Sequence, residues 1–132
     1  MATSARPGDS TARGEETAAV VERFNAALNR HDVDAVMALM TVDCVFENTY
    51  PPPDGERYEG QAAIRAFWEA MLRSSPDARF ETEELFAAAD RCVVRWRYDF
   101  TGADGIGGHI RGIDLFHVRD GKVAAKFAYV KG

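Results

Sequence analysis

The sequence predicts one α+β domain in which helices lie on one face of a curved antiparallel sheet. Two observations support this prediction. Apolar residues repeat with helical spacing in the first half of the chain, and they alternate with polar residues in the second half. The later segments are joined by short connections, which favour antiparallel pairing. The 132 residues, 46% hydrophobic and 28% charged, fit a single globular domain.

Three helices are expected. Residues 1–14 are small, polar and interrupted by Gly and Pro, so they are expected to form a flexible tail before a domain at residues 15–132. The first helix would begin at Glu15. Asp32 is placed to cap a short second helix, and Gly60 opens a third. The apolar face of that third helix consists of Ile64, Phe67, Trp68, Met71 and Leu72.

Five strands are expected. The segment 42–48 alternates like a strand and leads into a loop at 49–60, where three prolines exclude regular structure. The other strands are predicted at residues 79–88, 91–100, 109–118 and 122–130.

Alternation in these strands predicts which side chains face the helices. In the strand 91–100 the inward set is Cys92, Val94, Trp96, Tyr98 and Phe100. In the strand 109–118 it is Ile110, Gly112, Asp114, Phe116 and Val118. Asp114 is the one charged residue on this face, and a carboxylate there loses hydration, so it needs a partner or a raised pKa.

The turn after Val118 decides which residue partners Asp114. A two-residue type I′ turn at Asp120-Gly121 would place Phe127 opposite Asp114, whereas a three-residue bulged turn would place Lys126 there. The bulged turn is favoured because Arg119 then needs no positive φ and because it gives Asp114 a cation.

The bulged turn also predicts what the outer face of the sheet carries. It places four large apolar side chains together there: Ile113, Leu115, Phe127 and Tyr129. A patch of this kind usually marks a partner surface, so the sequence predicts a homodimer through this face. Arg95 and Arg97 are expected at the rim of that surface or on a solvated face.

Composition and motifs exclude several classes of function. A net charge of −5 argues against nucleic acid as a partner, and no apolar run reaches the roughly 20 residues of a membrane span. The N-terminal residues do not resemble a secretory signal, so a cytoplasmic location is expected. Cys44 and Cys92 are interpreted as small buried side chains, and no motif indicates a metal or a cofactor.

Three blocks of sequence point to a known family. They read VVERFNAALNRHDVDAVMALM, YEGQAAIRAFWEAML and GIDLFHVRDGKVAAKFAYVKG. Together they resemble the nuclear transport factor 2-like superfamily, in particular its SnoaL-like branch and ketosteroid isomerase, over residues 16–131. The resemblance implies a cystatin-like cone, in which three helices pack in a strongly curved antiparallel sheet around a deep apolar pocket.

The resemblance also assigns roles to individual residues. Ketosteroid isomerase combines an Asp base, a Tyr and a protonated Asp, which fall on Asn48, Phe24 and Asp114. Asn48 cannot take a proton and Phe24 has no hydroxyl, so steroid isomerisation by that mechanism is disfavoured. SnoaL-like cyclases depend on an acidic pocket residue, which makes Asp114 the candidate for proton transfer.

The expected function is therefore that of a pocket protein for a small apolar ligand. It would act as an isomerase, cyclase or dehydratase on an apolar carbonyl compound or polyketide-like metabolite, without a cofactor. Asp114 would move a proton, and Lys126 or Asn48 would polarise an oxygen. The residues expected to line the pocket are Phe24, Phe46, Trp68, Trp96, Tyr98 and Phe116.

Four simpler interpretations remain open. Asp114 could be a structural carboxylate satisfied by Lys126 or by a backbone N–H, and Asn48 could be a strand-end cap. The domain could bind hydrophobic ligands without turning them over. It could also be an interaction module that acts through its outer sheet face.

Overall fold

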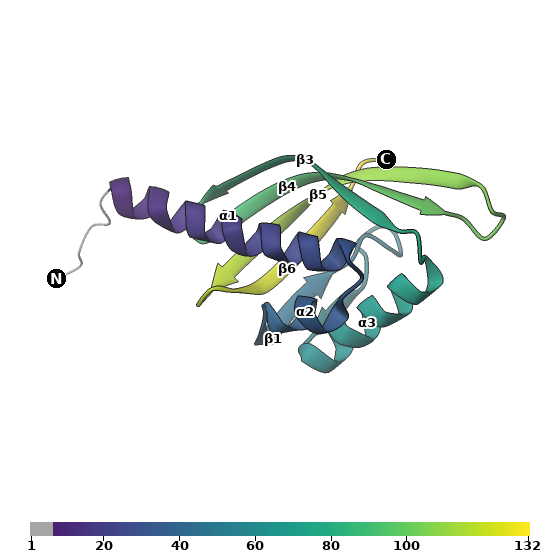
Figure 1. The fold of residues 1–132 in the computed structure, drawn as a ribbon, viewed down its shortest axis with the longest axis horizontal. Coiled ribbons are helices and arrows are strands. Elements are labelled where there is room, and N and C mark those ends of the chain that lie inside the picture. Colours follow the sequence, from purple (N-terminus) through teal and green to yellow (C-terminus); the bar gives the residue numbers. More distant parts are fainter. Residues whose placement is uncertain (1–6) are drawn as a thin grey trace.

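A computed structural model describes residues 7–132 and shows three helices packed against one open, curved sheet of six strands (Figure 1). The α+β fold class is confirmed. The helices are α1 (Pro7–Asn29), α2 (Val33–Ala38) and α3 (Gln61–Ser74). The strands are β1 (Met40–Glu47), β2 (Arg57–Glu59), β3 (Arg79–Ala88), β4 (Arg91–Thr101), β5 (Gly107–Arg119) and β6 (Lys122–Val130).

The strands follow the order β2-β1-β6-β5-β4-β3 across the sheet. All neighbours are antiparallel except β1 and β6, which run parallel and bring the first strand of the chain beside the last. Strand β2 falls inside the segment that was expected to be a loop. The prolines occupy only the turn, and the chain after them pairs with β1, beginning with a hydrogen bond from Asn48 N to the carbonyl of Glu56 at 2.9 Å.

Helix α1 begins at Pro7, eight residues earlier than expected, so residues 7–14 are helix and not tail. Proline is favoured at a first helical position, where its missing N–H costs nothing. Gly14 lets the helix approach the β3–β4 turn, since a Cβ there would lie 3.2 Å from the carbonyl oxygen of Ala87. Thr17 fixes the contact by donating to the carbonyl of Ala89 at 2.6 Å. Residues 1–6 of the expected tail lie outside the described residues.

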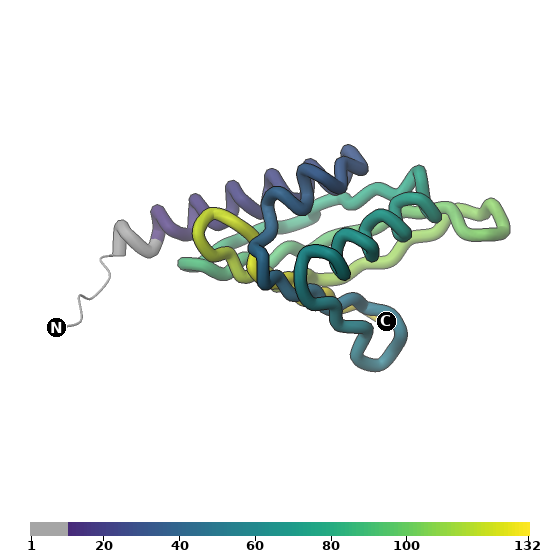
Figure 2. Tube along the Cα trace, turned by 90° about the horizontal axis from the view of Figure 1, so that it is seen from below, coloured from purple at the N-terminus to yellow at the C-terminus, as the bar shows by residue number. Residues whose placement is uncertain are grey.

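The far end of α1 is tied to the start of β3. The Asn29 side chain donates to the carbonyl of Phe80 and accepts from its N–H, both at 2.8 Å. Figure 2 shows α1 and α3 on the same side of the strands, and the core lies between the helices and the sheet. Within residues 7–132, no helix is long and apolar enough to cross a bilayer.

The predicted facing of β4 and β5 is confirmed. Cys92, Val94 and Trp96 are buried on one face of β4, while Arg95 is exposed on the other. Asp114 shares the buried face of β5, where it is 5% exposed.

Candidate functional site

An apolar cavity of about 230 Å³ lies between α3 and the inner face of the sheet. Phe67, Trp68 and Met71 form its helical wall. The strands and the end of β1 supply the rest of the lining: Phe46, Asn48, Thr49, Phe80, Trp96, Tyr98, Ile110, Lys126 and Ala128. Among these lining residues Lys126 carries the only charged side chain, and more than half of the others are aromatic, so its ammonium is the one charge at an otherwise uncharged wall.

The Lys126 amine is enclosed by aromatic rings and one carboxylate. Its side chain is 5% exposed, and Nζ lies 4.7 Å from the ring centre of Phe46 and 5.3 Å from that of Trp68. Both distances are in the range of cation–π attraction, which compensates in part for the lost hydration. Nζ also lies 3.3 Å from Oδ2 of Asp114. The other hydrogens of the amine are available to a ligand in the cavity.

Asp114 lies behind Lys126 and does not line the cavity. Burial raises the pKa of its carboxyl, although the Lys126 ammonium and the Trp96 indole act to lower it. The indole does not reach hydrogen-bonding geometry: among the described residues, neither Asp114 Oδ1 nor Trp96 Nε1 has a hydrogen-bond partner. Asp114 can therefore exchange a proton with Lys126, but it reaches a ligand only through that amine.

The turn between β5 and β6 combines features of both expected turns. Asp120 and Gly121 form a two-residue turn with φ values of 54° and 72°, as a type I′ turn requires. An extra residue at Ala124 then shifts the register between Val118 and His117. Because one residue of slip reverses the facing of a strand, this bulge turns Lys126 inward.

The same shift changes the cross-strand neighbours that were expected. Ala128, and not Lys126, lies directly opposite Asp114, while Lys126 lies opposite Phe116. Lys126 and Asp114 are thus diagonal neighbours on one face, close enough for a long side chain to bridge. Phe127 is not opposite Asp114 either, since it faces outward opposite Leu115.

Gly112 leaves the space that the Trp96 side chain occupies. The two residues are directly opposite on β5 and β4, and a Cβ at Gly112 would lie 2.5 Å from the Trp96 ring and 2.2 Å from the carbonyl oxygen of Tyr129. Such contacts are not tolerated, so only glycine leaves room for the indole at this position. The sequence showed Gly112 on the inner face without indicating this purpose.

Asn48 lines the cavity and immediately follows β1. No hydrogen bond joins its side-chain amide to another described residue, so the amide can turn toward a ligand oxygen. Its backbone is held by the loop, because Gly55, with φ of 76°, packs so closely that a Cβ would meet the Asn48 carbonyl oxygen. Asn48 and Thr49 also border a second hollow of about 560 Å³ on the outer side of the loop.

Six of the nine predicted site residues line the cavity, and three do not: Asp114, which lies behind Lys126, Phe24 and Phe116. Phe46, Trp68, Trp96 and Tyr98 line the cavity as expected. Phe24 and Phe116 do not: both are fully buried and pack edge to face with ring centres 5.6 Å apart, deeper in the core. The alternation of side chains along a strand cannot distinguish residues that line the cavity from residues of the core, because both kinds point to the inner side of the sheet.

Sequence reasoning missed six residues of the lining. They are Thr49, Phe67, Met71, Phe80, Ile110 and Ala128. The sequence could have indicated Phe67 and Met71 as lining residues, since they are four residues apart on the apolar face of α3. Phe80, Tyr98 and Ile110 form a row across three strands, but the row depends on a β3 bulge between Thr82 and Glu84 that the sequence does not indicate.

Comparison with known proteins agrees with this architecture. Residues 21–126 match the SnoaL-like domain family. A nuclear transport factor 2-like protein of unknown function from Mesorhizobium loti is 42% identical, with a TM-score of 0.78 over 91% of this chain and 94% of that one.

Two more distant solved structures share the fold. One, from Xanthomonas campestris pv. campestris, is named as a candidate polyketide cyclase: identity is 21% and the TM-score 0.73, over 90% of this chain and 93% of that one. The other, from Kribbella flavida, is named as a candidate ketosteroid isomerase: identity is 22% and the TM-score 0.71, over 90% of this chain and 80% of that one.

Proposed function

This chain belongs to the SnoaL-like domain family, and from its cavity we infer that it binds a small apolar carbonyl compound or polyketide-like metabolite and transfers a proton on it. The reaction would be an isomerisation, cyclisation or dehydration that uses no cofactor. The observation that carries this proposal is the Lys126 amine in the wall of an aromatic cavity, backed by the buried carboxyl of Asp114.

The roles follow from position. Lys126 and the Asn48 amide would hold the ligand oxygen, because both are hydrogen-bond donors at the cavity wall. Negative charge that develops on that oxygen would be stabilised by the ammonium in a medium of low dielectric constant. Asp114 would exchange its proton with Lys126, and the aromatic lining would exclude water.

The first test is ligand binding, which can be followed by the fluorescence of the protein's own tryptophans. Both tryptophans of the chain, Trp68 and Trp96, line the cavity, so tryptophan fluorescence reports on this site. We expect aryl ketones and fused-ring phenols to quench this fluorescence saturably. No saturable change with any member of such a panel would contradict the proposal.

The second test is proton transfer, which needs no knowledge of the natural substrate. In D₂O, the wild type should accelerate exchange of the hydrogens next to the carbonyl of a bound ketone, followed by NMR. Asp114→Asn and Lys126→Met should lose this acceleration. Asp43→Asn, which changes an exposed carboxylate bound to Arg119, is the control and should retain it. Binding without exchange would support the alternative of a non-catalytic ligand-binding protein.

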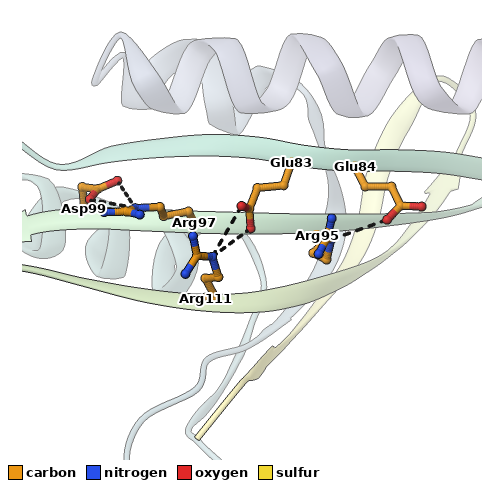
Figure 3. A network of polar contacts seen from close by, with 6 residues as sticks. All are labelled: Glu83, Glu84, Arg95, Arg97, Asp99 and Arg111. Carbon is orange, nitrogen blue, oxygen red and sulfur yellow. Dashed lines mark hydrogen bonds and ion pairs between the residues drawn. The ribbon is translucent and has the colours of Figure 1, made fainter.

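We also propose that the domain forms a homodimer through the outer face of the sheet. Ile113 and Tyr129 are cross-strand neighbours there and are 42% and 61% exposed, and Leu115 and Phe127 continue the patch. Beside them, six charged side chains form ion pairs along β3, β4 and β5 (Figure 3). A surface that carries both signs of charge suits contact with a second copy of itself, because a two-fold interface must be self-complementary.

A further inference from the structure

The chain contains three lysines, and their surroundings differ sharply. Lys122 and Lys131 are exposed, whereas Lys126 is 4% exposed and lines the cavity. A primary amine held in an apolar site beside a proton acceptor is the arrangement in which lysine acts as a nucleophile toward carbonyl carbon. Asp114 Oδ2, at 3.3 Å from Nζ, is that acceptor.

We propose that Lys126 forms a covalent imine with an aldehyde or ketone bound in the cavity. This inference rests on the proposed function, since it requires the cavity to admit a carbonyl compound. It goes further in assigning Nζ as the atom that bonds to the ligand carbon, and in making Asp114 a positioning residue that accepts and returns the proton.

The step balances without an outside reactant. The Lys126 ammonium passes a proton to Asp114, and the Nζ lone pair then adds to the carbonyl carbon while the carbonyl electron pair moves to oxygen. That oxygen takes two protons that began on the ammonium, and it leaves as water when the C=N bond forms. The third proton stays on nitrogen, so the product is a protonated imine that faces the Asp114 carboxylate. Nothing is oxidised or reduced.

The lining suits this chemistry in polarity and in size. The donors at the wall, including the Asn48 amide, can hold the carbonyl oxygen before attack and the water that leaves. Trp96 Nε1 is buried without a hydrogen-bond partner among the described residues, and the indole favours the ionised form of Asp114, which accepts the proton from Lys126. A cavity of about 230 Å³ equals the liquid volume of about seven or eight water molecules, and so accommodates a one-ring aldehyde.

Reductive trapping tests the proposal on the wild-type protein. Benzaldehyde and sodium cyanoborohydride convert an imine into a stable secondary amine, and peptide mass mapping then reads each lysine separately. We expect Lys126 to be modified about tenfold or more faster than Lys122 and Lys131, because the bound aldehyde has a high effective concentration at Nζ. Labelling of Lys126 at or below the rate of the two exposed lysines would overturn the proposal.

Two further measurements separate the imine from the cavity itself. Benzyl alcohol has the shape of the aldehyde and cannot form an imine, so its saturable quenching of tryptophan fluorescence tests binding alone. Binding without trapping would overturn the imine and leave the proposed function intact, whereas failure of both would overturn both. In Lys126→Arg, which keeps a cation in the cavity, labelling at position 126 should vanish while benzyl alcohol still binds.

Discussion

At the scale of single residues, the most consequential group is the buried carboxyl of Asp114. It is almost fully removed from water, and its one ionic partner reaches only Oδ2. Desolvation penalises the ionised form more than the Lys126 ammonium favours it, and the pKa of Asp114 is therefore raised. Asp114 could be singled out from sequence, because alternation alone places it on an apolar face.

This raised pKa predicts a pH dependence of stability. The folded protein holds the Asp114 proton more tightly than the unfolded chain, so the contribution of this carboxyl is full below pH 3.8 and is lost as pH rises through the folded-state pKa. The free energy of unfolding of the wild type, relative to that of Asp114→Asn, should therefore fall as pH rises from 3.8 through the folded-state pKa of Asp114. Urea denaturation at a series of pH values measures it.

Asp77→Asn provides a control of opposite sign. A hydrogen bond from Thr101 lowers the pKa of Asp77, so this carboxylate stabilises the fold above pH 3.8 and loses its effect as pH falls. The free energy of unfolding of the wild type, relative to that of Asp77→Asn, should therefore rise with pH. If the free energy of unfolding relative to Asp114→Asn also rose with pH, the ion pair with Lys126 would affect the pKa of Asp114 more than burial does. Asp114 would then be a structural partner of Lys126.

Gly112 yields a second prediction at this scale. Gly112→Ala forces a methyl group against the Trp96 ring and the Tyr129 backbone, and we expect a loss of about 1–3 kcal/mol in the free energy of unfolding. The displaced indole should also weaken ligand binding. Gly107→Ala, in the same strand with nothing within 4 Å of the added Cβ, should change stability by no more than about 0.5 kcal/mol. Equal effects of the two changes would refute the role of Gly112 in leaving space for Trp96.

At the scale of elements, periodicity predicted α3 and the last four strands closely, because each has one apolar face and clear turn signals at its ends. It could not predict the extra residue at Ala124, since a bulge leaves the composition of a strand unchanged. The inward facing of Lys126 was nevertheless expected, because the favoured three-residue turn gives the same parity as a two-residue turn followed by a bulge. Strand β2 was missed because its three residues follow prolines and bury little.

The apolar face of α3 contributes some side chains to the cavity and others to the core. Substitutions at adjacent positions should therefore affect either ligand binding or stability. Met71 lines the cavity and is half-buried, whereas Leu72 belongs to the core. Met71→Ala should weaken binding of an aryl ketone by about fivefold through lost apolar contact, with a small effect on stability. Leu72→Ala should cost about 2–5 kcal/mol of stability and leave affinity nearly unchanged. Thermal unfolding and tryptophan fluorescence titration measure both, and a reversed pattern would mean that the ligand binds elsewhere.

At the scale of the whole molecule, the two faces of the sheet differ in what they carry. Its inner face and α3 enclose the cavity, and its outer face combines an apolar patch with paired charges. Arg97 and Arg111 are directly opposite each other, and their repulsion is offset by Asp99 and Glu83 (Figure 3). Exposure of the apolar side chains of this surface to water is unfavourable, and a contiguous apolar patch of this kind typically marks an interaction surface.

The proposed dimer makes the last prediction. In sedimentation experiments the wild type should have twice the chain mass of 14.6 kDa. Tyr129→Asp should dissociate it, because an interface of this kind would bury an unpaired carboxylate twice, once in each copy. Val42→Asp changes a side chain that is 86% exposed on β1, outside the patch, and should remain dimeric.

The ligand-binding behaviour of the Tyr129→Asp monomer then shows how the two faces are related. Tyr129 does not line the inner cavity, so the monomer should still bind aryl ketones with wild-type affinity. A monomeric wild type would contradict the dimer and leave the outer face for a different partner. A monomeric Tyr129→Asp that has lost binding would mean that the second copy holds the Asn48 loop in place, since Tyr129 borders the outer hollow beside that loop.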